Sequence, residues 1–227
     1  MKRIKLEDRA LPNYTKREEQ FNTISHIVGG ALGVVAVLAC AIVAAYHRNI
    51  WGIVSGVVYG CTVILLFTMS SIYHGMKPGL AKKVFQVLDH CTIFLLIAGT
   101  YTPMLLNRFR EVYPTEAWIN FAIIWGLAAL GITLNAIDLK RYRVFSMICY
   151  LGMGWLIIFS AQKTLAVLGA PFFWLILAGG ICYTVGAVLY MLGKQLKKKY
   201  MHSVFHFFVD AAALLHFLGI VIYIMPG

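Results

Sequence analysis

The chain has 227 residues, of which 60% are apolar, a mean hydropathy of +0.77 and a formal net charge of +11. So apolar a composition excludes a soluble domain with a polar surface and indicates a protein dissolved in lipid. The basic residues lie in short segments beside apolar stretches, so we expect anionic lipid headgroups, and not nucleic acid, to be their counterpart.

Seven apolar stretches follow one another along the chain, each near the length of about 20 residues that a bilayer-spanning helix needs. They run over residues 21–45, 51–73, 84–106, 117–137, 144–161, 171–192 and 204–225. Helix-breaking residues mark several edges: Gly75 and Pro78 end the second stretch, Pro103 disturbs the end of the third, and Pro171 opens the sixth. Because backbone groups in lipid must pair internally, we predict an all-α bundle of seven transmembrane helices. It forms a single domain over residues 21–227, preceded by a polar, basic segment over residues 1–20.

The basic residues alternate between the two sides that these spans define. Sixteen Lys and Arg lie in the N-terminal segment and in the second, fourth and sixth loops, against four in the other loops. Since short basic loops stay in the cytosol, we predict a cytosolic N-terminus and a C-terminus outside. The five cysteines all fall inside apolar stretches, and we expect them to be small buried residues without disulfides.

Ionisable side chains inside the predicted spans are the candidates for function, because they are costly in lipid. His202 and His206 are four residues apart at the start of the seventh span, so their imidazoles share a helical face at the spacing of two metal ligands. The same spacing also suits histidines that pack against neighbouring helices. His74 ends the second span, and the predicted topology brings it to the same cytosolic face.

Two further polar residues fall at a similar depth. Asp89 lies about six residues into the third span, and Ser70 lies one turn before His74 on the same face. Three imidazoles with a fourth position open to water describe a catalytic zinc site, in which a nearby carboxylate can activate that water. The alternative is an interfacial polar cluster that anchors helices and binds no ion. We favour the metal, since an intramembrane aspartate beside several histidines needs compensating charge.

Three other ionisable residues in the spans are weaker candidates for metal ligands. We expect His26 to brace the bundle near the cytosolic face. His216 lies about 15 Å along the helix from His206, too far for the same ion, and we expect it to form a hydrogen bond across the bundle. Asp210 continues the spacing of the two α-helical histidines one turn deeper, either as their partner or as a buried neutral acid.

Four segments resemble the hemolysin III proteins of bacteria, within the progestin and adipoQ receptor (PAQR) family. They are residues 19–29 (EQFNTISHIVG), 70–74 (SSIYH), 88–103 (LDHCTIFLLIAGTYTP) and 202–217 (HSVFHFFVDAAALLHF). The resemblance implies a zinc ion held by His74, His202 and His206, with Ser70 and Asp89 nearby. It also implies kinship with alkaline ceramidases, and it places the protein in the bacterial inner membrane. The bacterial branch is named for haemolytic activity and is linked to membrane homeostasis.

Three functions are left open by the sequence. The first is a zinc-dependent hydrolase of ceramide-like lipid amides, with Asp89 as general base and the Ser70 hydroxyl stabilising the oxyanion. The second is a lipid sensor or membrane-homeostasis factor in which zinc holds the second, third and seventh helices together. The third is a haemolytic pore former, which the apolar character of the spans disfavours. Asp210 departs from the family pattern, where that position is usually apolar.

Overall fold

The computed structural model describes residues 5–227, and every regular element in that part of the chain is helical. The elements are η1 (Leu6–Asp8), α1 (Lys16–Tyr46), α2 (Ile50–Gly75), α3 (Leu80–Met104), η2 (Leu105–Phe109), α4 (Arg110–Val112), α5 (Pro114–Asp138), α6 (Arg143–Trp155), η3 (Leu156–Ser160), α7 (Ala161–Gln195) and α8 (Met201–Tyr223). The prediction of an all-α membrane protein is confirmed for the described residues. Lys2 and Arg3, which counted toward the predicted cytosolic charge, lie outside them.

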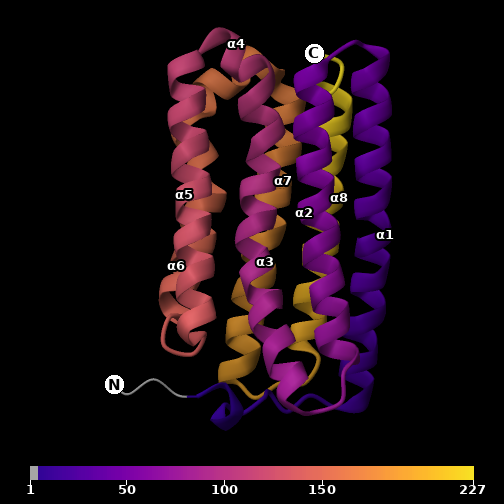
Figure 1. The fold of residues 1–227 in the computed structure, drawn as a ribbon, viewed down its shortest axis with the longest axis vertical. Coiled ribbons are helices and arrows are strands. Elements are labelled where there is room, and N and C mark those ends of the chain that lie inside the picture. The colour runs from indigo at the N-terminus through magenta and orange to yellow at the C-terminus, as the bar shows by residue number, and fades with distance from the viewer. Residues whose placement is uncertain (1–4) are drawn as a thin grey trace.

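Six helical stretches of the described chain are long and apolar enough to cross a membrane, against the seven spans predicted. The difference lies in residues 143–195, where α6, η3 and α7 follow one another without an intervening loop. Within α7, Gly169 has a φ of +80°, a left-handed conformation that interrupts the helix, and Pro171 follows it. In Figure 1 the ribbon turns at the upper end of the bundle between α6 and the main part of α7. The predicted boundary between the fifth and sixth spans therefore coincides with a break in the backbone.

Pro103 disturbs the end of α3, as predicted. The helix passes into the π-helical η2, in which Asn107 leaves the helical conformation with φ −100° and ψ −127°. The Asn107 side-chain amide donates to the Ser55 hydroxyl at 2.9 Å, and its oxygen accepts from Asn49 Nδ2 at 3.0 Å. Asn49 also donates to the Met225 carbonyl at 3.2 Å. These bonds join α2, η2 and the end of α8 at the upper end of the bundle in Figure 1.

Close approach of α1 and α2 depends on small residues at their contact. An added Cβ on Gly60 would lie 2.7 Å from the backbone nitrogen of Val37, and one on Gly33 would lie 2.9 Å from that of Ile64. A side chain at either position would push the two helices apart. Large apolar side chains instead cover the outer face of α1, as expected for a surface in contact with lipid.

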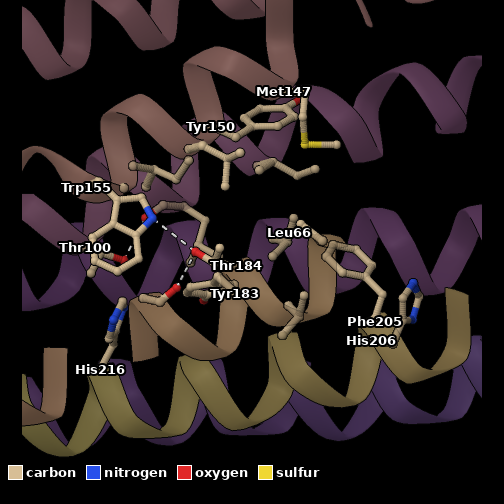
Figure 2. A pocket seen from close by; sticks show the side chains of 18 of the residues that line it. Leu66, Thr100, Met147, Tyr150, Trp155, Tyr183, Thr184, Phe205, His206 and His216 are labelled. Atoms are coloured by element: carbon tan, nitrogen blue, oxygen red, sulfur yellow. Dashed lines mark hydrogen bonds between the residues drawn. The ribbon is translucent and has the colours of Figure 1, made fainter. Parts of the chain in front are cut away.

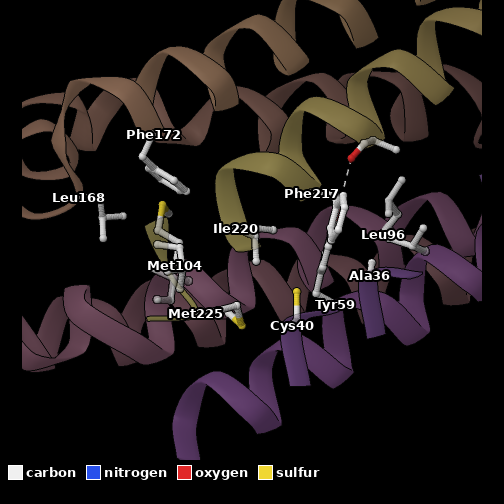
Figure 3. Packing of buried hydrophobic residues seen from close by; sticks show 14 of the residues in the cluster. Ala36, Cys40, Tyr59, Leu96, Met104, Leu168, Phe172, Phe217, Ile220 and Met225 are labelled. Carbon is white, nitrogen blue, oxygen red and sulfur yellow. Dashed lines mark hydrogen bonds between the residues drawn. The ribbon is translucent and has the colours of Figure 1, made fainter. Parts of the chain in front are cut away.

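The main hydrophobic cluster lies where α1, α2, α3, α7 and α8 meet (Figure 3). Its largest buried side chains include Tyr59, Phe172 and Ile220, each at most 1% exposed. The Tyr59 hydroxyl donates to the Ala213 carbonyl at 3.4 Å, which satisfies the one polar atom of that side chain.

The cysteines are all free, as predicted, but they are not all buried. Cys40 and Cys91 are buried, Cys149 and Cys182 are partly exposed, and Cys61 is exposed. The prediction of burial is wrong for Cys61, because a thiol is apolar enough to face lipid on the outside of α2.

Candidate metal centre

Three histidines from distant parts of the sequence converge at one end of the bundle. His74 lies in the last turn of α2, and His202 and His206 lie in the first two turns of α8. The Nε2 atom of His202 is 3.1 Å from Nε2 of His74 and 3.1 Å from Nε2 of His206. Their ligand atoms all lie within 4.8 Å of one another, and no second such group of His, Cys, Asp or Glu occurs in residues 5–227. The histidine triad, His74, His202 and His206, could therefore hold a metal ion.

The spacing within the triad suits a tetrahedral ion. Zinc–imidazole bonds of about 2.0–2.1 Å at tetrahedral angles put two ligand nitrogens about 3.3 Å apart. The two separations of 3.1 Å from His202 Nε2 are within a few tenths of an ångström of that value. Three neutral nitrogen donors also leave a fourth position for water or substrate, as in catalytic zinc sites. The donor set thus fits zinc in both chemistry and spacing.

Glu19, in the first turn of α1, determines the tautomer of His74. Its Oε2 lies 2.6 Å from His74 Nδ1, and its Oε1 accepts from Lys82 Nζ at 2.7 Å. A carboxylate only accepts, so His74 Nδ1 carries the hydrogen, and Nε2 presents its lone pair to the other two imidazoles. Carboxylate–histidine pairs of this kind orient metal ligands and raise their basicity. The sequence prediction missed Glu19, because an acid in the first turn of a helix is equally well explained by the helix dipole.

One face of α1 holds the start of α8 in place. The helix begins with a capping box, in which the Thr15 hydroxyl accepts from the Glu18 N–H at 3.3 Å and Glu18 accepts from the Thr15 N–H at 2.8 Å. The same Glu18 carboxylate accepts from the backbone N–H of Tyr200 at 2.6 Å. One turn further on, Asn22 accepts from the Ser203 hydroxyl at 2.7 Å. These bonds position both histidines of α8.

Two aromatic rings stack on the triad. His26 lies parallel to His206, with 3.6 Å between ring centroids and 7° between planes. The predicted bracing role of His26 fits this contact. Tyr14, just before α1, stacks on His202 with a centroid separation of 5.0 Å and an angle of 14°. Burial raises the pKa of Tyr14 above its usual range, so the phenol over the triad is neutral.

A long, mostly apolar cavity begins beside the triad and runs along the bundle (Figure 2). The cavity has a volume of about 200 Å³, it is partly open to the surroundings, and its wall comes mainly from α3, α6, α7 and α8. His206 and Phe205 lie at one end in Figure 2, and His216 lies at the other. A cavity of this shape, with polar groups at its ends, suits an elongated amphipathic molecule.

Ser70 and Asp89, the two predicted catalytic residues, are both on the wall of this cavity. Ser70 is 1% exposed, and its hydroxyl has no hydrogen-bond partner among the described residues. Asp89 is 8% exposed, and its Oδ2 lies 3.7 Å from Nδ1 of its neighbour His90. Asp89 is not among the residues close enough to share one ion with the triad. Both residues therefore face the space in which a ligand would lie.

The two deeper candidates on α8 have different surroundings. His216 bonds across the bundle, as predicted, with its Nε2 3.1 Å from the Ile176 carbonyl oxygen on α7. Asp210 lies against α1, where an added Cβ on Gly29 would be 2.8 Å from its Oδ1. That Oδ1 has no hydrogen-bond partner within residues 5–227, so it makes no bond to a triad histidine.

Comparison with known proteins places these features in a family. The chain matches the family model for Haemolysin-III related proteins over residues 14–217. It is 36% identical over 210 residues to Hemolysin-3 of Bacillus cereus, and the alignment covers 92% of this chain and 93% of that protein. It is 33% identical over 210 residues to the Hemolysin-3 homolog of Bacillus subtilis (strain 168), with 92% and 96% covered.

A more distant relative is the human monocyte to macrophage differentiation factor, 26% identical over 195 residues, with 82% of this chain and 77% of that protein covered. No solved structure matches the chain at a significant level. The family match extends from Tyr14, which stacks on the triad, to the end of the cavity at His216, and the resemblance seen in the sequence is confirmed. The chain is a multi-pass membrane protein and belongs to the haemolysin III-related family.

Proposed function

We propose that this protein is a zinc-dependent hydrolase of ceramide-like lipid amides in the bacterial inner membrane, with zinc held by His74, His202 and His206. The observation that carries the proposal is the convergence of three Nε2 atoms at the end of a long apolar cavity whose wall includes Ser70 and Asp89. A membrane lipid would lie with its acyl chain in the cavity and its amide at the triad. The proposal thus gives the triad, Ser70 and Asp89 roles in one reaction.

Zinc at the triad would polarise the amide carbonyl and favour the ionisation of water. Residues on the cavity wall would complete the chemistry. The Asp89 carboxylate would accept a proton from the attacking water and deliver it to the leaving amine, giving a carboxylic acid and an amine. The Ser70 hydroxyl, which has no hydrogen-bond partner in residues 5–227, would donate a hydrogen bond to the carbonyl oxygen as negative charge builds up on it. The apolar wall would limit the access of bulk water.

We infer that the chain crosses the membrane seven times, with the N-terminus in the cytosol. The interruption at Gly169 supports this count, because it divides residues 143–195 into two parts that are each long enough for about 30 Å of hydrocarbon. The described N-terminal segment and the C-terminus lie at opposite ends of the bundle (Figure 1), as an odd number of crossings requires. The basic segments share an end with the triad, so the metal would lie near the cytosolic face.

Metal analysis and lipid turnover on one purified sample test the proposal. We expect one zinc per chain in the wild-type protein, loss of zinc in His202→Ala, and no loss in the matched control His47→Ala, which changes an exposed histidine between α1 and α2. Mass spectrometry should detect fatty acid released from a long-chain amide, with release abolished by chelation and restored by added zinc. A fully zinc-loaded protein that hydrolyses no lipid in a broad amide panel would overturn the enzymatic proposal.

A structural metal is the second candidate, and one observation favours it. The triad ties α2 to α8, and Glu19 links it to α1, so an ion there would hold three helices together. The protein would then sense lipid or maintain the membrane without releasing a product. This alternative predicts a fall in thermal stability on chelation together with an unchanged lipid panel. Ion flux across sealed liposomes would separate both candidates from a haemolytic pore.

A further inference from the structure

The end of the cavity far from the triad carries two polar atoms with unused hydrogen-bonding capacity. His216 on α8 and Tyr183 on α7 both line this end (Figure 2). The His216 Nδ1 and the Tyr183 hydroxyl are buried and have no hydrogen-bond partner among the described residues. His216 is only 8% exposed, and its ring centroid lies 5.6 Å from that of Tyr183. Buried polar atoms are rarely left unpaired, so this pair points to a ligand group.

Neighbouring polar groups on the same wall already have partners. Trp155 Nε1 donates to the Thr184 hydroxyl at 3.1 Å. The Thr184 and Thr100 hydroxyls each donate at 2.8 Å to a backbone carbonyl one turn earlier in their own helix. Among the polar groups named here within the described chain, unused hydrogen-bonding capacity at this end of the cavity is therefore left on Tyr183 and His216.

The bond that His216 already makes determines what its free nitrogen can bind. The Ile176 carbonyl oxygen only accepts, so the His216 Nε2 that faces it at 3.1 Å must carry the hydrogen. A neutral imidazole then has a bare Nδ1, which needs a donor. The Tyr183 hydroxyl can both donate and accept. A ligand hydroxyl could use both groups, a ketone could use only the Tyr183 donor, and a methylene could use neither.

We propose that His216 and Tyr183 form a specificity site for a hydroxyl group on the hydrophobic chain of the substrate. The inference rests on the proposed function, because it places the amide of that lipid at the triad. His216 follows His206 by ten residues on α8, which separates the two by about 15 Å along the helix axis. The preferred substrates are therefore amides of a fatty acid hydroxylated near the middle of its chain, about 15 Å from the amide.

Binding and turnover are measured separately to test this assignment. Competition against a fluorescent fatty acid gives the affinity of the zinc-loaded protein for stearic acid, for positional isomers of hydroxystearic acid and for the matching ketostearic acid. We expect the best hydroxy isomer to bind about tenfold more tightly than stearic acid, as for one good hydrogen bond, and the keto acid to fall between them. The same chains are then supplied as amides, and their hydrolysis is followed by mass spectrometry.

Tyr183→Phe is the decisive variant, because it removes the hydroxyl and keeps the ring. It should lose most of the preference for the hydroxy acid while its affinity for stearic acid stays unchanged. Thr100→Val is the matched control, since it removes a hydroxyl on the same wall that is already bonded, and it should keep the preference. His216→Gln is the second variant, and it should lose selectivity for hydroxyl over ketone if its thermal unfolding shows an intact fold.

The outcomes distinguish this inference from the proposed function. Equal binding of hydroxylated and plain chains would overturn the specificity site, while hydrolysis of the plain amide would still support the enzyme. An equal loss of preference in Thr100→Val and Tyr183→Phe would also overturn it. Hydroxyl-selective binding without hydrolysis of any amide would support the site and overturn the proposed reaction.

Discussion

The contact between Glu19 and His74 should control how tightly the triad holds a metal. Glu19→Gln keeps the size of the side chain and removes its charge. The Glu19 Oε2 lies 2.6 Å from His74 Nδ1, and its Oε1 lies 2.7 Å from Nζ of Lys82, a residue only 4% exposed. The substitution therefore removes a charge-assisted hydrogen bond to a candidate metal ligand and takes the carboxylate partner from a buried ammonium group.

Two estimates of the effect on zinc agree. A hydrogen bond to a charged group contributes about 1.5–3 kcal/mol, which corresponds to a change of about 10- to 150-fold in a binding constant. Loss of the carboxylate behind a metal-bound histidine lowers metal affinity by about 10- to 100-fold. We expect the zinc affinity of Glu19→Gln to fall within this range. The metal-free protein should lose about 1–3 kcal/mol of stability. The loss is limited because the Lys82 ammonium group keeps its bond to the Met76 carbonyl at 3.0 Å.

Competition with a chromophoric zinc chelator on the purified protein measures this affinity directly. Glu116→Gln is the matched control, since it removes a carboxylate that pairs with Lys163 at 2.5 Å at the start of α5, at the other end of the bundle (Figure 1). Its zinc affinity should equal that of the wild-type protein. Wild-type zinc affinity in a folded Glu19→Gln protein would refute the assignment of Glu19 as the residue that orients His74.

Three further predictions concern the metal, the base and the packing. Chelation should lower the melting temperature of the wild-type protein, and added zinc should restore it. A ligand at about 100 times its Kd adds about 2.7 kcal/mol to the free energy of unfolding. An unchanged melting temperature would contradict a metal at the triad. Asp89→Asn should reduce the rate of amide hydrolysis by about 10²- to 10⁴-fold and leave the zinc content unchanged. Product analysis and metal analysis of one sample measure both quantities. Loss of zinc would instead indicate that Asp89 is a metal ligand. Gly60→Ala should lower the free energy of unfolding by about 1–3 kcal/mol, because the added Cβ would lie 2.7 Å from the Val37 nitrogen. Gly126→Ala, which has open space around the added Cβ, should leave the free energy of unfolding nearly unchanged.

The helices were predictable because each depends on a long run of one kind of residue. The α1, α2 and α5 helices contain the predicted stretches, and α8 contains all of its stretch but the last two residues. The break at Gly169 lies between the residues predicted as the fifth and sixth spans. The π-helical turn after Pro103 was not predictable, because the conformation of Asn107 depends on hydrogen bonds to α2, more than 50 residues away in the sequence. The break within residues 143–195 likewise depends on the backbone of Gly169, which has a φ of +80°.

The triad could be predicted from the sequence for two reasons. Helix spacing places His202 and His206 on one face, and the loop charges predict that the end of α2 and the start of α8 lie on the same side of the membrane. His74 and His202, 128 residues apart, are indeed in contact. The supporting residues were not accessible in this way. The α1 helix is apolar around most of its circumference, so its sequence alone does not indicate which face meets the other helices.

The start of α1 and the segment before it contact all three histidines of the triad, although α1 supplies no triad ligand. Glu19 bonds to His74, and His26 stacks on His206. Tyr14, in the segment that leads into α1, stacks on His202. Each imidazole thus contacts a different residue between Tyr14 and His26, so the three donor atoms are preorganised by a segment that supplies no triad ligand.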